Sequence, residues 1–287
     1  MENLLDSTLK QNFRAAIFDY DGTLTDRYFS STPPAKLCVA LQELSRKVPV
    51  AICSGRVFSN ALPKLQMLLG EHFAELQKNW FLFLENGGAG YRFENGEYVE
   101  MYHVLWPEVL FPKAKFDFLI QEFFTGKVNY IDLPPGSCVI RPLNYDKLNS
   151  VELLEAVDKL EIMGLEFLQK HGLDSFLRVG NSAVGLIFYL KDGDKDRGIE
   201  AFGKFLGFAD PYEEILVVGD RPADHGNDSA LLSGRLGTPF TVGEMVSGKN
   251  LPYPVMNGTA RMTGPLATLH LLEQLHFSRS SPILPPL

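Results

Sequence analysis

Four short apolar runs along the chain each end in polar residues or glycine. Residues 15–19 read AAIFD, residues 48–53 read VPVAIC, residues 80–84 read WFLFL and residues 214–219 read EILVVG. Apolar runs of this length, bounded by turn-forming residues, are typical of buried strands. We therefore predict four strands of a parallel sheet, each leading into a polar loop.

Helical patterns lie between these runs. Leu37, Leu41 and Leu44 recur at helical spacing within residues 35–47, and residues 57–69 repeat the pattern. An alternation of strand, loop and helix is typical of an open α/β sheet. In such a sheet the carboxyl ends of neighbouring strands line one crevice, where ligands bind.

The middle of the chain has a different pattern, from about residue 90 to about residue 190. Candidate strands there surround helix-like stretches near 113–125 and 151–170, and two pairs of strands read as hairpins. This predicts a separate α+β unit, after which the α/β pattern resumes with a helix over 195–206. We therefore expect a Rossmann-like, parallel-sheet α/β core formed by residues 1–88 and 190–287, with a smaller α+β unit over residues 89–189.

The charge balance excludes some classes of partner. The chain of 287 residues has 27 Lys and Arg against 35 Asp and Glu, a formal net charge of −8. An acidic chain has no general attraction for nucleic acids or anionic lipids, so an anionic ligand must be held by local charges. The three cysteines show no zinc-ligand spacing. No apolar run resembles a signal peptide or reaches the ~18 residues of a membrane span, so we expect a cytoplasmic protein.

The segment FDYDGTLTD, residues 18–26, carries two carboxylates at the end of the first predicted strand. Gly22 allows the chain to curl there, so Asp19 and Asp21 can face one pocket. A simple turn and a Ca²⁺ loop are the alternatives, but an EF-hand needs further oxygen ligands and Leu24 interrupts its pattern. Because Asp220 also follows a predicted strand, the sequence predicts a polar site where these strand ends meet.

The same segment resembles the first motif, DxDGT[LV], of the haloacid dehalogenase-like phosphatases. The other motifs of that family are matched in order by ICSGR with Ser54, DKDRGIEAF with Lys195, and VVGDRPADHGNDSALL with Asp220. The resemblance therefore covers nearly the whole chain.

The resemblance implies a two-step phosphoryl transfer. Asp19 would attack phosphorus and form an aspartyl-phosphate, and Asp21 would protonate the leaving oxygen and then activate water. For Lys195 alone, a solvated residue at a helix start is the alternative. The residues implied to bind the phosphoryl group are Ser54, Gly55, Lys195, Gly22 and Thr23.

The family pattern also implies a Mg²⁺ ion in an oxygen-rich site. Asp19, Asp220 and the main-chain carbonyl of Asp21 would hold it. The acidic loop after Asp220 offers more than one residue that could give the ion further support. We favour Asp228 with Asn227, because Gly226 frees the turn that brings them inward, and Asp224 is the rival.

The position of the inserted unit indicates which subclass of the family the chain resembles. In this chain the α+β unit lies between the second and third motifs. A cap at that position makes the chain similar to the subclass that contains the trehalose-phosphate and sucrose-phosphate phosphatases and the phosphomannomutases. The sequence ENGG at residues 85–88 also resembles a turn of that subclass. This implies a small phosphorylated substrate, a sugar phosphate first. A phosphomannomutase-like phosphotransferase and a catalytically inactive binding protein are the alternatives.

Substrate choice is expected to lie in the inserted unit. Arg141, Arg178 and Asn181 could reach a sugar or a second anion, although each could also be a solvated surface residue. His103 and Trp106 are interpreted as packing residues, and Asp192 and Asp194 as turn residues where the insert rejoins the core.

Overall fold

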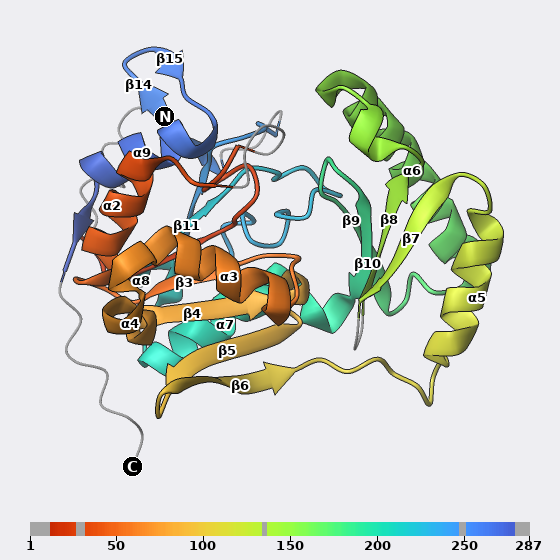
Figure 1. The fold of residues 1–287 in the computed structure, drawn as a ribbon, viewed down its shortest axis with the longest axis horizontal. Coiled ribbons are helices and arrows are strands. Elements are labelled where there is room, and N and C mark those ends of the chain that lie inside the picture. The colour runs from red at the N-terminus through yellow and green to blue at the C-terminus, as the bar shows by residue number, and fades with distance from the viewer. Residues whose placement is uncertain (1–11, 27–31, 134–136, 247–250, 279–287) are drawn as a thin grey trace.

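The computed structural model describes residues 12–26, 32–133, 137–246 and 251–278. These residues form an α/β core and a smaller α+β unit that lies beside it, drawn in green in Figure 1. The predicted fold class, a parallel-sheet core with a second α+β unit, is confirmed. None of the helices in the described ranges is long and apolar enough to cross a membrane.

Within the described residues the core is built on an eight-stranded sheet in the order β13-β12-β11-β2-β3-β4-β5-β6. All pairs from β13 to β4 are parallel, and the last two pairs are antiparallel. The strands are β2 (Ala15–Phe18), β3 (Val50–Cys53), β4 (Trp80–Leu84), β5 (Ala89–Glu94), β6 (Glu97–His103), β11 (Ile215–Gly219), β12 (Thr238–Thr241) and β13 (Tyr253–Pro254).

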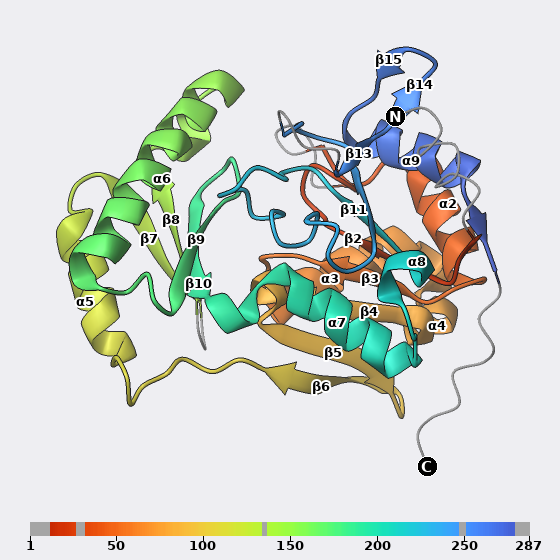
Figure 2. The same cartoon turned by 180° about the vertical axis from the view of Figure 1, so that it is seen from behind.

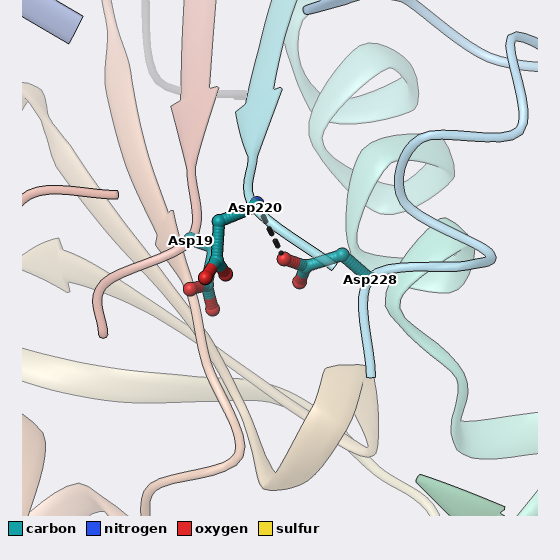
Figure 3. Close-up of side chains that lie close together, drawn as sticks. All are labelled: Asp19, Asp220 and Asp228. Atoms are coloured by element: carbon teal, nitrogen blue, oxygen red, sulfur yellow. Dashed lines mark hydrogen bonds between the residues drawn. The ribbon is translucent and has the colours of Figure 1, made fainter. Parts of the chain in front are cut away.

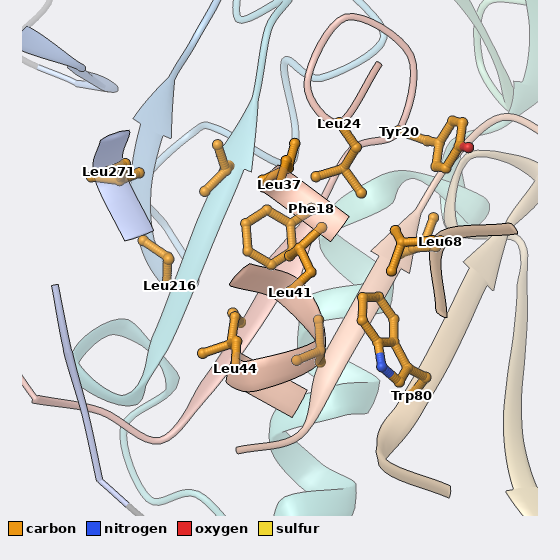
Figure 4. Close-up of a cluster of buried hydrophobic side chains, with 14 of the residues drawn as sticks. Phe18, Tyr20, Leu24, Leu37, Leu41, Leu44, Leu68, Trp80, Leu216 and Leu271 are labelled. Atoms are coloured by element: carbon orange, nitrogen blue, oxygen red, sulfur yellow. The ribbon is translucent and has the colours of Figure 1, made fainter. Parts of the chain in front are cut away.

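Helices cover both faces of this sheet. They are α2 (Ala35–Ser45), α3 (Phe58–Leu69), α4 (Phe73–Leu76), α7 (Lys195–Leu206), α8 (Pro211–Glu214) and α9 (Gly264–Gln274). Successive residues of β2 point to opposite faces, so Ala16 and Phe18 pack with α2, α3 and α9, whereas Ala15 and Ile17 pack with α7. Figure 4 shows the first of these clusters, and α7 covers the face seen in Figure 2.

Two short pairs of strands complete the core. β1 (Asn12–Phe13) pairs in parallel with β16 (His276–Phe277), and β14 (Met256–Asn257) forms a small hairpin with β15 (Ala260–Arg261). The first pair brings the two ends of the described chain together.

The smaller unit, residues 104–190, is called the insert below. Its antiparallel sheet has the order β7-β8-β10-β9, and α5 and α6 pack on one face around buried aromatic residues such as Phe116 and Phe167. Asn149 begins α6 with a capping box in which Glu152 bonds back to the Asn149 backbone. The elements are α5 (Lys113–Phe123), β7 (Val128–Leu133), β8 (Ser137–Pro142), α6 (Ser150–His171), β9 (Leu177–Asn181) and β10 (Leu186–Leu190).

The boundary expected at residue 89 differs from the structure. The hairpin of β5 and β6 does not belong to the α+β unit; β5 pairs with β4 and extends the core sheet. An antiparallel hairpin has the same sequence pattern whichever sheet it joins, so its pattern could not show this pairing. The predicted strands at 15–19, 48–53, 80–84 and 214–219 are confirmed within two residues, and α7 has the predicted bounds.

A glycine allows α7 to lie close against the core sheet. A Cβ atom built on Gly198 would lie 2.9 Å from the Cβ of Phe83 and 3.0 Å from its Cγ. Phe83 is fully buried in β4, so it has no room to move away. This close approach fixes where α7, and the lysine at its first position, lie relative to the strand ends.

Substituting Gly198→Ala tests this packing. Alanine in a helix interior is normally more favourable than glycine by about 1 kcal/mol. Here the added methyl group overlaps Phe83, so we expect the free energy of unfolding to fall by roughly 1–3 kcal/mol. Urea unfolding followed by circular dichroism measures the change, and a stabilised variant would contradict the close approach.

Candidate active site

Three carboxylates gather at the carboxyl ends of the two central strands. Asp19 follows β2, Asp220 follows β11, and Asp228 reaches back from the loop after β11 (Figure 3). One oxygen atom of each residue lies within 4.8 Å of the other two, and all three side chains are buried. β2 and β11 are hydrogen-bonded parallel neighbours, so the residues directly after them meet at one edge of the sheet.

The ammonium group of Lys195 lies between two of these carboxylates. Its Nζ donates to Asp19 Oδ1 at 2.6 Å and to Asp228 Oδ1 at 2.5 Å. The Lys195 side chain is fully buried. Asp194, expected to be a turn residue, is the N-cap of α7 and accepts a hydrogen bond from the Lys195 backbone N–H. The cap fixes the first residue of the helix, and hence the place of the lysine.

The charges in this cluster shift one another's pKa values. Burial, and after it the charge of Asp228, raises the pKa of Asp19 well above its usual range, although Lys195 opposes the rise. Burial alone would lower the pKa of Lys195, but Asp19 and Asp228 raise it. Burial alone would raise the pKa of Asp228, but Lys195 and two backbone N–H groups lower it. When all three carboxylates are ionised, one ammonium leaves an excess of two negative charges.

The structure brings Asp228, and not Asp224, into the cluster. Asp228 Oδ2 accepts hydrogen bonds from the backbone N–H groups of Asp220 at 2.9 Å and Arg221 at 3.1 Å. These bonds fold the loop back onto the end of β11. Asp224 lies on the exposed part of the same loop.

The cluster fits a divalent cation. Asp19 Oδ2 is buried and has no hydrogen-bond partner among the described residues. Carboxylate oxygens are ligands that Mg²⁺ and Ca²⁺ prefer, and an ion of charge +2 balances the two excess negative charges. Asp19 and Asp220 are the residues that would hold it, since both oxygens of Asp228 are already engaged by hydrogen-bond donors.

Asp21 lies beside the cluster and is bound by an arginine. Arg56 Nε donates to Asp21 Oδ2 at 2.9 Å, and Arg56 Nη2 donates to Asp21 Oδ1 at 2.6 Å. The guanidinium group also lies over the ring of Tyr20, 5.6 Å from its centroid. This two-point bond fixes the orientation of the Asp21 carboxylate.

Apart from Lys195, which is buried among the carboxylates, the residues expected to bind phosphate fall into two groups. Ser54 is buried, and with Gly55 it lines the cavity above Asp19. Gly22 and Thr23 do not line this cavity. The N–H of Gly22 donates to the carbonyl of Thr25, and Thr23 is fully buried. These two residues shape the turn after β2 instead of facing the cavity.

The cavity lies between the core and the insert and has a volume of about 810 Å³. The core supplies Asp19, Asp21, Arg56 and Asn227 to its lining, and Asn227 Oδ1 is buried without a hydrogen-bond partner. The insert closes the other side with residues of β7, β8 and β10 and of the turn before α6. These lining residues include Ile131, Val139, Arg141, Tyr145, Asp146, Ser150 and Ile187.

Of the three candidates in the insert, only Arg141 lines the cavity. Arg178 instead pairs with Asp194 at 2.8 Å. The side chain of Asn181 is used within the insert, where its Nδ2 donates to Asp158 and Glu161 of α6. Trp106 packs on Phe116 in the insert core, as expected for a packing residue. His103 lies at the end of β6 in the core sheet, and its contacts are with the carboxylates of Glu85 and Glu100.

The backbone of Asn181 joins the insert to the acidic loop. Its N–H donates to the carbonyl of His225 at 2.7 Å, and its carbonyl accepts from the N–H of Asn227 at 3.2 Å. Asn181 and Gly226 thereby form a parallel β-bridge. The insert therefore holds the loop that carries Asp228.

The comparisons with known proteins concern the fold. No protein-family model matches the chain, and no curated protein matches its sequence. A HAD/COF-like hydrolase from Plasmodium vivax is 16% identical, with a TM-score of 0.66, and the match covers 94% of this chain and 98% of that one. The IMP-bound IMP-nucleotidase of Plasmodium falciparum is 16% identical, with a TM-score of 0.63 over 91% of this chain and 68% of that one.

A haloacid dehalogenase-like hydrolase from Bacteroides thetaiotaomicron is also similar, with 16% identity, a TM-score of 0.55, and coverage of 82% of this chain and 90% of that one. At such identities the likeness concerns the three-dimensional fold. The chain therefore has the fold of the haloacid dehalogenase-like hydrolases, with a parallel-sheet core and a second α+β unit.

Arg56 is among the residues of the site that were not assigned a role from the sequence. Arg56 stands in the SGR segment beside Ser54, and its adjacency to a predicted strand end was the available signal. Its partner, Asp21, lies 35 residues away in the chain. A pairing over that separation depends on the neighbouring positions of β2 and β3 in the sheet.

The excess of negative charge gives a prediction about stability. Asp19→Asn keeps an oxygen acceptor for Lys195 and removes one buried charge, so without a bound cation the variant should be more stable than the parent. In EDTA at pH 8 we expect its unfolding temperature to rise by about 2 °C or more. Differential scanning calorimetry measures this shift.

Asp174→Asn, at an exposed position of the insert, is the matched control and should change stability little. Added Mg²⁺ should stabilise the parent protein more than Asp19→Asn. A variant that unfolds at a lower temperature in EDTA would contradict the charge argument.

Proposed function

We propose that the protein is a Mg²⁺-dependent phosphatase that hydrolyses a small phosphomonoester, with a sugar phosphate as the first candidate. The observation that carries the proposal is the buried ammonium of Lys195, which lies between Asp228 and Asp19, the carboxylate of the three that lines the cavity. A buried ion pair of this kind contributes little net stability, so its cost is better explained by chemistry than by folding.

In the first step Asp19 acts as the nucleophile. One of its carboxylate oxygens bonds to phosphorus, the bond between phosphorus and the substrate oxygen breaks, and an aspartyl-phosphate forms. Lys195 places a positive charge beside the attacking carboxylate and the phosphoryl oxygens. Ser54, which lines the cavity next to Asp19, donates to a phosphoryl oxygen.

Asp21 acts as the general acid in the first step and as the general base in the second. Its acid form protonates the leaving oxygen, and in the second step its carboxylate takes a proton from the water that attacks phosphorus, so that Asp19 is released with inorganic phosphate. Arg56 binds both oxygens of Asp21. One oxygen must therefore exchange Arg56 for the leaving group before this transfer.

Asp19, Asp220 and the main-chain carbonyl of Asp21 are the groups proposed to hold Mg²⁺, with Asp228 and Asn227 supporting the site. When bound, the ion supplies positive charge that offsets the carboxylates and the phosphoryl group. It also favours the ionised form of Asp19, which burial otherwise disfavours.

The insert is proposed to act as a cap that sets substrate choice. Asn60, Asp146 and Ser150 line the cavity and offer groups that suit sugar hydroxyls. Because the fold is similar to that of an IMP-nucleotidase, nucleoside monophosphates are also candidate substrates, and they too are small phosphomonoesters. A cytoplasmic location fits such substrates, and neither nucleic acid nor membrane is proposed as a partner.

Phosphate release from a panel of phosphomonoesters tests the proposal. The panel contains trehalose 6-phosphate, sucrose 6-phosphate, mannose and glucose phosphates, IMP and p-nitrophenyl phosphate, each with Mg²⁺ or EDTA. We expect release only with Mg²⁺, and a loss of at least about 10³-fold in Asp19→Asn, because the nucleophile is removed. Turnover that survives Asp19→Asn would contradict the mechanism. Isomerisation of a sugar phosphate without net release of phosphate would indicate the mutase alternative. The absence of both reactions would indicate a binding protein.

The leaving group distinguishes the role of Asp21. Asp21→Asn should slow hydrolysis of a sugar phosphate by about 10²-fold or more, because its alkoxide must be protonated as it leaves. p-Nitrophenyl phosphate releases a stable phenolate and should be affected much less in its first step. The measurement is kcat/KM for both substrates with the parent and the variant, and equal losses would count against Asp21 as the acid.

A further inference from the structure

The cap side of the cavity combines an apolar row with one arginine. Ile131 of β7, Val139 of β8 and Ile187 of β10 are paired across the sheet and line the cavity together. Arg141 lies two residues beyond Val139 on the same strand and lines the same cavity. Side chains two residues apart in a strand share a face, so Arg141 borders the apolar row.

The Arg141 side chain is held in place by an aromatic ring. Its guanidinium group lies over the ring of Tyr145, 4.8 Å from the centroid, and Nη1 donates to the Tyr145 hydroxyl at 3.0 Å. Its Nε is buried and has no hydrogen-bond partner in the described part of the chain. Stacking on a ring orients the planar fork of an arginine and leaves its other donors available.

The two arginines that line the cavity differ in their partners. Arg56 is neutralised by the two-point bond to Asp21. Among the residues that the structure describes, no carboxylate lies within ion-pair distance of Arg141, although Asp146 lines the same cavity. A partly buried guanidinium with an unused donor and no counter-ion is a site for an anion.

We propose that Arg141, positioned by Tyr145, binds a second anionic group of the substrate, a phosphate or a carboxylate. The inference rests on the proposed phosphatase function. It defines the substrate class as a phosphomonoester that carries another anion on the same carbon skeleton. The scissile phosphate lies at Asp19 and Ser54, the second anion lies at Arg141, and the skeleton packs along Ile131, Val139 and Ile187.

Two matched pairs of substrates test this class. Fructose 1,6-bisphosphate and fructose 6-phosphate differ by a second phosphate, and 3-phosphoglycerate and glycerol 3-phosphate differ by a carboxylate. With the parent protein and Mg²⁺, we expect kcat/KM to be higher for the member with the second anion by roughly 10- to 100-fold, the value of a charge-assisted hydrogen bond. The pair that shows the larger ratio identifies the second anion as phosphate or carboxylate.

Variants assign the preference to Arg141. Arg141→Gln should abolish it by raising KM for the substrate with two anions, while kcat/KM for the matched monoanion changes less than about 3-fold. Tyr145→Phe should weaken the preference in part, because the ring stays and the hydroxyl is lost. Lys159→Gln removes one exposed charge from the insert outside the cavity and should leave the preference intact.

Binding provides a measurement that does not need turnover. In the Asp19→Asn background, titration calorimetry should show that Arg141→Gln weakens binding of the preferred member of the pair at least about 10-fold and leaves its partner unchanged. Arg141-dependent binding without hydrolysis by the parent protein would contradict the phosphatase and keep the anion site. Equal kcat/KM within both pairs, or equal losses on both members in Arg141→Gln, would overturn the anion site and leave the phosphatase standing.

Discussion

The fold places one ammonium group, that of Lys195, among three buried carboxylates, and much of the molecule serves that placement. The N-cap at Asp194 fixes the first residue of α7, and the close contact of Gly198 with Phe83 fixes how near the helix lies to the sheet. The hydrogen bonds that Asp228 accepts from the backbone N–H groups of Asp220 and Arg221 fold the acidic loop back onto β11. Because the lysine balances only one of three charges, the site has an excess of negative charge when all three carboxylates are ionised.

The insert lines one side of the cavity and also contacts the core segments that form the site. Asn181 holds the loop that carries Asp228, and Arg178 holds the helix cap at Asp194. The side chain of Ile187 lies so close to Gly55 that a Cβ atom there would approach its Cδ1 to 2.9 Å. The insert thus touches three segments of the core that border the candidate site. A displacement of the insert would break backbone hydrogen bonds next to the buried carboxylates, which couples access to the cavity with the geometry of the site.

The sequence predicted the parts of the structure that depend on local pattern. Buried parallel strands are continuous apolar runs that end in polar residues, so Asp19, Ser54 and Asp220 could be placed at one edge of a sheet. The choice between Asp224 and Asp228 depended on how the loop folds onto β11, which spacing does not determine. The hairpin after Gly88 was assigned to the insert because its pattern does not specify which strand it pairs with.

Contacts between distant segments could not be predicted in this way. Asn181 had the residue type of a substrate ligand, yet its amide is fully used by Asp158, Glu161 and the backbone of Ala183. Arg56 and Arg141 were equivalent as residue types, and only the fold shows that one has a carboxylate partner and the other a tyrosine. The availability of a polar group is a property of its neighbours, and those are set by tertiary structure.

The distribution of positive charge explains how an acidic chain could select an anionic ligand. The net charge of −8 opposes anions at long range, so binding must be gained inside the cavity. Of the two proposed anion sites, a ligand with a single anion would occupy the one at Asp19, where Lys195 and a bound cation would supply positive charge, and would leave Arg141 without a counter-ion. A ligand with two anions satisfies both, provided that their separation matches the apolar row between them. Specificity then follows from the spacing of two charges more than from overall attraction, since ligands of the wrong length leave one buried charge unpaired.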